Sequence, residues 1–178
     1  MHILKRLLIA VALLIAAPFV VALFVKKDFD VTRTVVIDRP RADVFAYTRL
    51  VKNQLAYATW FKQDPAMKTS FRGTDGAVGF VMAWESANSN VGKGEQEIKR
   101  VVEPERIDVE IRFSAPFVAT NPAETLFEAV DPGHTRVTNV YHGHMDYPGN
   151  LLCSAVAEKI GQDMGQNLST LKSILEKR

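Results

Sequence analysis

The stretch LLCSAVAEKIGQDMGQNLSTLKSILEK, residues 151–177, decides the fold of this chain. Its apolar residues recur every three or four positions, which places them in one stripe along an α-helix. Asn150 precedes the stretch, just after Pro148-Gly149, and we expect its side chain to cap the first helical turn. The pattern predicts a long helix that covers another layer with one face, formed by Leu152, Val156, Ile160, Met164, Leu168, Leu171 and Leu175.

Two glycines, Gly161 and Gly165, lie one turn apart inside this predicted helix. Each costs about 1 kcal/mol relative to alanine in a helix interior. We therefore expect them to leave room for a close neighbour, which is either the backbone of a strand or a ligand.

An uncharged apolar run near the N-terminus begins at Leu7 and ends at Val25. At about 1.5 Å per residue, a helix of this length spans about 30 Å, the thickness of the hydrocarbon core of a bilayer. A cleaved signal peptide is the alternative, but Lys26-Lys27 follows the run where a small-residue cleavage site would stand. We predict a single-pass membrane anchor in residues 1–27 and a separate domain in residues 28–178.

The orientation of this anchor depends on its flanking charges. Lys5-Arg6 on one side balances Lys26-Lys27 on the other, so the positive-inside rule decides little. The short leading tail with its free amine favours an N-terminus inside and a domain on the extracytoplasmic side, which is the periplasm in a bacterium.

Composition excludes several classes of function. The net charge of +2 comes from the basic residues around the apolar run, since all 20 acidic residues follow it. The remaining domain is slightly acidic and has no basic stripe, so we expect no nucleic-acid binding. The one cysteine, Cys153, excludes an internal disulfide and a cysteine metal cage, and we interpret it as a small buried residue.

The middle of the chain alternates between strand and turn patterns. Residues 31–37 are rich in β-branched side chains and predict a first strand. Pro40 opens a first short helix, with Val44 and Phe45 inward, and residues 52–59 predict a second. About six further strands follow, up to residue 145. One long helix is the only available cover for such a sheet, which predicts an α+β helix-grip fold: a curved antiparallel sheet of six to seven strands wrapped on the C-terminal helix.

The residues also carry a family resemblance. The strings RADVFAYTRL, TWFKQDPAM, FRGTDGAVGFVMAWES, VGKGEQEI and IGQDMGQNLSTLK resemble those of SRPBCC proteins, the START-like helix-grip superfamily, in its polyketide cyclase-like branch. This superfamily includes lipid and hormone carriers, aromatase/cyclases and ring-hydroxylase subunits. The resemblance therefore implies a ligand cavity without implying a reaction. Asn139 and Asn167 depart from the pattern, at positions where the family often has an aromatic residue and a glycine.

Strand alternation predicts which side chains face this cavity. An apolar chamber with a few polar groups suits an apolar ligand held by several hydrogen bonds. The alternative is that the aromatic side chains are simply core. We expect Met164 and Trp84 to approach each other across the chamber. The predicted ligand-binding residues are Trp60, Phe80, Met82, Trp84, Gln96, Ile98, Ile111, Phe113, Thr125, Phe127, Asn139, Tyr141, Met164 and Leu168.

Two groups of titratable residues are candidates for chemistry. His142, His144 and Asp146 share one face of a strand, but ligands in a row do not converge on a metal, and that face is opposite Tyr141. Glu95 and Glu97 are explained by exposed strand positions. The sequence has neither a nucleophile elbow nor a phosphate-binding loop, so we expect no metal, no cofactor and no catalytic residues.

The sequence is compatible with three functions. The first is a membrane-tethered, non-catalytic binding module for a small apolar or lipid-like molecule. The second is a cyclase/dehydratase-type or hydrolase-type enzyme in which Tyr141, Asn139 and Gln96 polarise a carbonyl group. The third is an interaction domain with a cavity filled by side chains. The sequence does not determine the oligomeric state.

Overall fold

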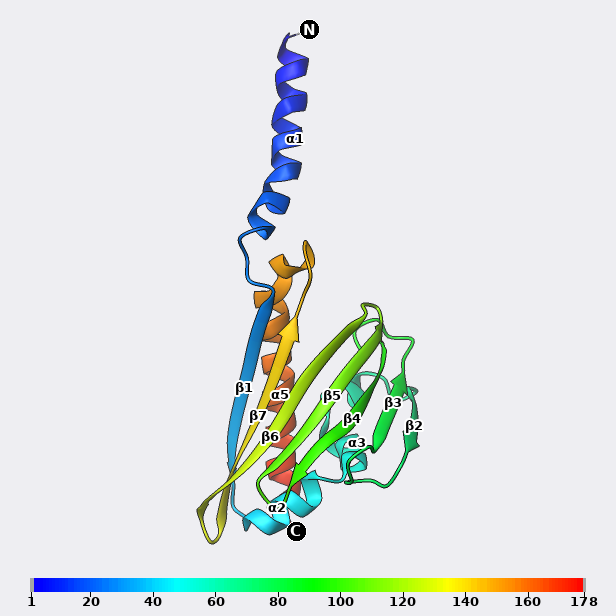
Figure 1. Cartoon of the computed structure of the whole chain (residues 1–178), viewed down its shortest axis with the longest axis vertical. Coiled ribbons are helices and arrows are strands. Elements are labelled where there is room, and N and C mark those ends of the chain that lie inside the picture. The colour runs from blue at the N-terminus through cyan, green and yellow to red at the C-terminus, as the bar shows by residue number, and fades with distance from the viewer. Residues whose placement is uncertain (1, 178) are drawn as a thin grey trace.

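A computed structural model describes residues 2–177; Met1 and Arg178, at the outer ends of the predicted anchor and domain, lie outside the described residues. Figure 1 shows one long helix, α1, projecting from a body in which a sheet wraps around a second long helix, α5. The helices are α1 (His2–Ala22), α2 (Arg41–Thr48), α3 (Gln54–Tyr57), α4 (Thr59–Gln63) and α5 (Cys153–Leu175), with 3-10 turns η1 (Val51–Asn53) and η2 (Gly149–Leu152).

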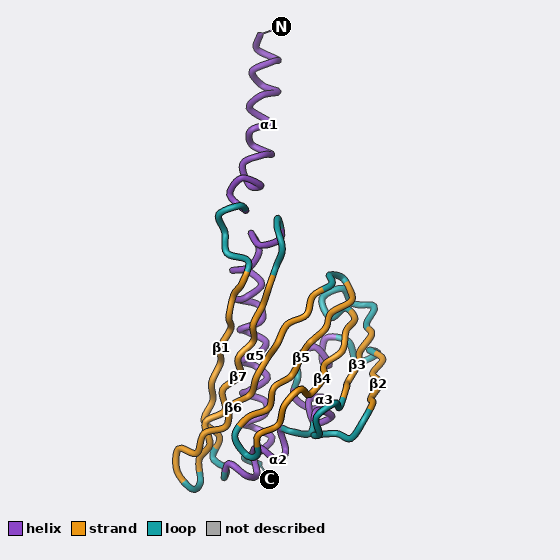
Figure 2. Tube along the Cα trace, viewed as in Figure 1, coloured by secondary structure: helices purple, strands orange, loops and turns teal. Residues whose placement is uncertain are grey.

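The sheet has seven strands in the spatial order β1-β7-β6-β5-β4-β3-β2, and all neighbours are antiparallel. Six consecutive strands form a meander, and β1 extends it by pairing with β7. The sheet bends around α5 (Figure 2), which confirms the predicted α+β helix-grip fold. The strands are β1 (Asp28–Ile37), β2 (Lys68–Arg72), β3 (Val81–Glu85), β4 (Lys93–Val102), β5 (Arg106–Ala115), β6 (Ala119–Asp131) and β7 (His134–His144).

The C-terminal half of α5 closes on the sheet in a packed core. Leu168, Leu171 and Leu175 are buried there, as the apolar stripe predicts. From α2, Phe45 packs edge-on against Phe127 of β6, with ring centroids 5.3 Å apart. Aromatic pairs of this geometry add to the stabilisation that burial of apolar area already supplies.

The beginning of α5 differs from the prediction. The helix starts at Cys153, and the residue before it, Leu152, provides no side-chain cap. Asn150 is buried instead, and its Nδ2 donates hydrogen bonds to the carbonyl oxygens of Ala22 (2.7 Å) and Val25 (2.8 Å). The predicted N-cap is therefore wrong, because Asn150 satisfies the end of α1 rather than the start of its own helix. Leu152, at the start of the predicted stripe, is exposed.

The two helix glycines have different surroundings. A Cβ atom at Gly161 would lie 2.1 Å from a guanidinium nitrogen of Arg33 on β1, so the room is taken by a side chain. A Cβ atom at Gly165 would meet nothing within 4 Å. The close neighbour at Gly161 is thus neither of the two that we expected, and Gly165 has open space beside it.

The N-terminal helix stands apart from the sheet. Residues Ile3–Ala22 of α1 are long and apolar enough to cross a membrane, and their side chains are exposed over the most apolar stretch. A signal sequence near an N-terminus has the same properties, so α1 is either a membrane span or a signal sequence.

Candidate ligand-binding cavity

A cavity of about 620 Å³ lies between the inner face of the sheet, the short helices and the N-terminal half of α5. Strand alternation places side chains on this face: in β4, Gly94, Gln96 and Ile98 are buried while Glu95 and Glu97 are partly exposed. The structure brings together ten predicted site residues in the lining: Trp60, Met82, Trp84, Gln96, Ile111, Phe113, Thr125, Asn139, Tyr141 and Met164.

Four predicted site residues do not line the cavity. Phe80, Ile98, Phe127 and Leu168 face inward, but each is at most 3% exposed and belongs to the packed core. Alternation identifies the buried face of a strand. It does not indicate along which part of the strand the covering helix packs directly against the sheet. These four residues belong to the part of the core in which side chains leave no free space.

Several lining residues were missed by the sequence argument. Thr48, Gln54 and Tyr57 come from the short helices, and Asn90 and Val91 come from the loop between β3 and β4. Thr48 was detectable, because it lies four residues after the inward Val44 on the same helix face. No period fixes the direction of side chains in the shorter segments, so the sequence held no signal for the other four. Asp163 and Asn167 were detectable, because they lie three residues after Ile160 and Met164 on the same helix face.

Two tyrosines give the cavity polar groups that stay protonated. Burial raises the pKa of Tyr141 to about 12 and raises the pKa of Tyr57 still further. Both hydroxyl groups therefore remain neutral hydrogen-bond donors over the physiological range.

Other polar lining groups are fixed or unpaired. The indole nitrogen of Trp84 donates to the Val91 carbonyl (3.3 Å), and Asn167 Oδ1 accepts from the Thr59 amide (2.8 Å). By contrast, Asn139 Oδ1 and Gln54 Oε1 are buried without a hydrogen-bond partner among the described residues. Unpaired buried oxygens are costly, so a donor on a ligand or a water molecule would stabilise them.

The sequence profile of the family described as "Polyketide cyclase / dehydrase and lipid transport" matches residues 28–176. The chain belongs to this family. The predicted resemblance to the SRPBCC superfamily is thereby confirmed, and the family description points to hydrophobic ligands. Direct comparison of the sequence with curated proteins finds no significant match.

Solved structures share the fold of this family member at low identity. Truncated norcoclaurine synthase from Thalictrum flavum superposes with a TM-score of 0.65 at 10% identity, over 85% of this chain and 95% of that chain. Ara h 8.0201 gives a TM-score of 0.61 at 17% identity, over 85% and 99%. A protein from Arthrobacter aurescens gives 0.60 at 14% identity, over 84% and 87%. These similarities show the fold alone.

The histidines lie on the outer face of the sheet, away from the cavity. Because β1 and β7 are antiparallel, His144 stands opposite Asp28 and His142 opposite Asp30, with Nδ1–Oδ1 distances of 2.6 Å in both pairs. Among residues 2–177, no group of three His, Cys, Asp or Glu side chains is arranged to hold a metal ion.

The strand glutamates are held in ion pairs on the same outer face. Arg112 Nε and Nη1 donate to Glu95 Oε1 (2.9 Å) and Glu97 Oε2 (2.8 Å), respectively. Hydrogen bonds from Arg72 and Arg112 lower the pKa of Glu95. These carboxylates are charged and bound to guanidinium groups, which does not suit general acid or base work.

Proposed function

We propose that this family member is a membrane-tethered binding module for a small apolar or lipid-like molecule. The observation that carries the proposal is the cavity of about 620 Å³. Ligand-binding cavities typically measure about 300–1,000 Å³ and have mostly apolar walls with a few polar groups. The lining here, with Trp84, Ile111, Phe113 and Met164 around Tyr141, has that composition.

The size of the cavity argues against an interaction domain whose interior is filled by side chains. Such a domain would close along the whole of α5, as the C-terminal half does around Leu168 and Leu175. The N-terminal half instead borders empty space large enough for a ligand of drug size.

The tether is the part of the proposal that rests on α1. We take residues 1–27 as an uncleaved, single-pass anchor and residues 28–178 as the binding domain on the extracytoplasmic side. The buried Asn150 supports an anchor that stays attached, because its amide group binds carbonyls at Ala22 and Val25. Removal of these residues would leave Asn150 without those partners, at a cost of about 1–3 kcal/mol.

An enzyme of the cyclase/dehydratase or hydrolase type is the second candidate. Tyr141, Asn139 and Gln96 do line one cavity and are able to polarise a carbonyl group. The two acidic lining residues are already paired, Asp163 with Lys159 (2.9 Å) and Glu124 with Arg106. A free carboxylate base is thus missing from the described lining, which favours binding over catalysis.

Titration with an apolar fluorescent dye, N-phenyl-1-naphthylamine, tests the proposal on the full-length protein in detergent. Ala123 lines the cavity, and Ala129 lies farther along the same strand in an exposed position. Ala123→Phe should weaken dye binding by at least about tenfold, which corresponds to about 1.4 kcal/mol. Ala129→Phe, the matched control, should leave binding unchanged. Equal binding by both variants, with folding verified by circular dichroism, would contradict the proposal.

A further inference from the structure

The anchor end of the domain carries two exposed apolar tips. The first, which we call the η2 tip, contains Tyr147, Leu151 and Leu152. The second, the β5–β6 tip, contains Phe117 and Val118, which are 75% and 88% exposed. Exposed apolar side chains that gather in one region indicate an interaction or membrane-contact site, whereas single scattered ones are normal.

Strand register places both tips at the same end of the sheet. Asp28, the first residue of β1, is paired with His144, the last residue of β7, directly before the η2 tip. Asn121, near the start of β6, accepts a hydrogen bond from the backbone amide of His144 (3.3 Å). The turn between β5 and β6 therefore lies at the end of the sheet at which α1 enters, displaced to one side of it, as Figure 1 shows.

Hydrogen bonds and an ion pair connect the end of the anchor to the η2 tip, so the two are not joined by a loose linker alone. Besides the two bonds from Asn150, the Met145 amide donates to the Lys27 carbonyl (2.9 Å), and the Lys27 ammonium pairs with Asp146 (3.1 Å). Ala22, the last residue of α1, is only 2% exposed. These contacts hold the end of α1 against the tip, so the tip and the membrane-spanning segment keep a fixed relation.

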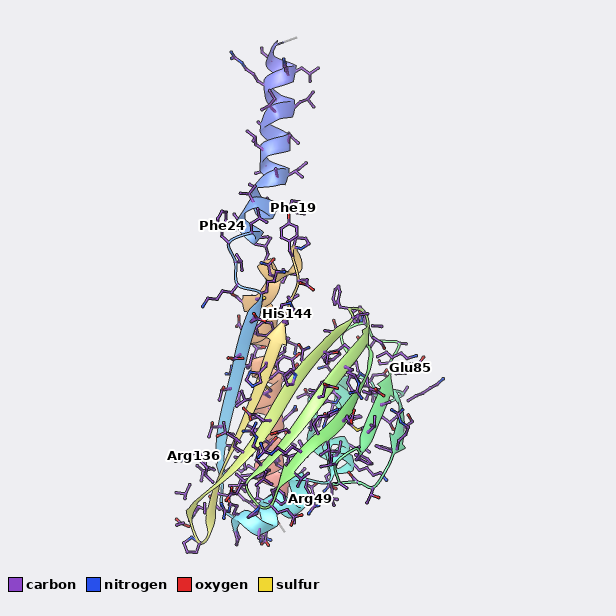
Figure 3. All side chains as sticks on the ribbon, in the orientation of Figure 1. Phe19, Phe24, Arg49, Glu85, Arg136 and His144 are labelled. Carbon is purple, nitrogen blue, oxygen red and sulfur yellow. The ribbon has the colours of Figure 1, made fainter. Side chains whose placement is uncertain are left out.

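The two ends of the domain differ in surface chemistry. Within residues 28–177, the exposed aromatic side chains are Phe117 and Tyr147, and both are at the anchor end. Figure 3 shows Phe19 and Phe24 near the end of α1 and His144 at the adjoining end of the sheet, with Arg49 and Arg136 toward the other end. Aromatic residues concentrate at the interface between lipid and water, which is where the end of α1 would lie.

We infer that the η2 tip and the β5–β6 tip are a bilayer-contact surface that rests on the same membrane that α1 spans. The inference depends on the proposed tether. The β5–β6 tip is set back from the η2 tip in Figure 1, so its contact requires α1 to tilt toward that side of the domain; membrane helices are tilted by about 20° on average.

This contact surface lies beside the cavity. Asn90 and Val91 line the cavity from the β3–β4 loop, which is at the same end of the sheet because Lys93 pairs with Ala115. Lys159 lines it from the N-terminal part of α5. The proposed bilayer contact and this part of the cavity lining therefore lie at the same end of the domain.

Spin-label accessibility on the full-length protein in phosphatidylcholine nanodiscs tests the contact. With Cys153→Ala as background, single cysteines replace Leu152 and Val118 at the two tips, Leu14 in α1 and Val130 at the opposite end. Val130 is the matched control, because it is an exposed valine like Val118 but lies beside the far β6–β7 hairpin. We expect collisions with oxygen to exceed those with a nickel chelate at 14, 152 and 118, and the reverse at 130.

The labels separate failure of the contact from failure of the tether. If 152 and 118 give the same aqueous pattern as 130 while 14 reports lipid, the tips do not touch the bilayer and the inference is overturned, although the tether stands. If 14 is also aqueous, the tether itself fails. A double variant, Phe117→Ser with Val118→Ser, should leave dye binding in detergent unchanged and lower the oxygen accessibility at 152.

Discussion

The two halves of α5 cover the same sheet in different ways. In the C-terminal half, Leu168 and Leu175 are each 3% exposed and pack into a closed core with residues of α2, while Leu171, 1% exposed, lies at the boundary between this core and the cavity. In the N-terminal half, Ile160 and Met164 are partly exposed and border the cavity. One continuous apolar stripe therefore contributes to a packed core at one end and to a cavity wall at the other.

This difference indicates where stability and binding reside. The closed half is densely packed, and in such a core the removal of even one methylene group lowers the stability of the fold. The open half retains apolar walls without the atoms that would fill them. Substitutions in the first region should change stability, and substitutions in the second should change binding.

The largest expected effect is in the closed half. Phe127→Ala removes a ring that is 2% exposed and packs against Phe45. It should lower the free energy of unfolding by about 3–5 kcal/mol, the range for aromatic residues in cores. Urea unfolding of the full-length protein in detergent, followed by tryptophan fluorescence, measures the change. A loss below about 1 kcal/mol would mean that this half is not closed.

A smaller effect is expected at the junction with α1. Asn150→Ala removes two hydrogen bonds to the Ala22 and Val25 carbonyls and should cost about 1–3 kcal/mol. Hydrogen exchange of residues 22–28 should accelerate while exchange in β4 and β5 stays the same. Unchanged hydrogen exchange near residue 25 would contradict the view that Asn150 holds the end of α1 by hydrogen bonds.

In the open half, Met164→Ala should cost less than the roughly 2–5 kcal/mol typical of a methionine in a closed core. The side chain already borders empty space, so its removal adds little new cavity surface. The same urea titration compares it with Leu168→Ala, one turn along the same helix. Equal losses at the two positions would remove the distinction between the halves.

The fold was predictable because it depends on periodic patterns. The three- and four-residue spacing from Val156 to Leu175 and the alternation in residues 106–113 identified the elements and their buried faces. The extent of the cavity was not predictable, since periodicity does not report how far side chains fill the space between the helix and the sheet. Phe127 and Thr125 share one strand face, yet only Thr125 borders the cavity.

The sequence also did not indicate the role of Asn150. An asparagine before a helix is an ordinary cap, and only the spatial approach of α1 gives it other partners. Lining residues such as Gln54 and Asn90 lie in a short helix and a loop, where the direction of a side chain depends on tertiary contacts.

The smallest expected effect concerns pH at the anchor end. Hydrogen bonds to Asp28 and Asp146 raise the pKa of His144 above its ordinary value near 6.5. The protonated His144 side chain therefore contributes its full stabilisation of the folded state below pH 6.5. This stabilisation is lost as pH rises through the raised pKa. Protection factors of amides 27–30 should fall slightly between about pH 6 and pH 8.5. His144→Gln should abolish this dependence, whereas a persisting dependence would assign it to another group.

Native mass spectrometry of the full-length protein, released from detergent, tests most directly whether the open half of α5 holds an apolar ligand. The wild-type protein should carry an additional mass in the range of a lipid or similar small molecule. Ala123→Phe should lose that mass, while Ala129→Phe should retain it. A wild-type protein observed only without a ligand, or an adduct that survives Ala123→Phe unchanged, would contradict the assignment of the cavity as a binding site.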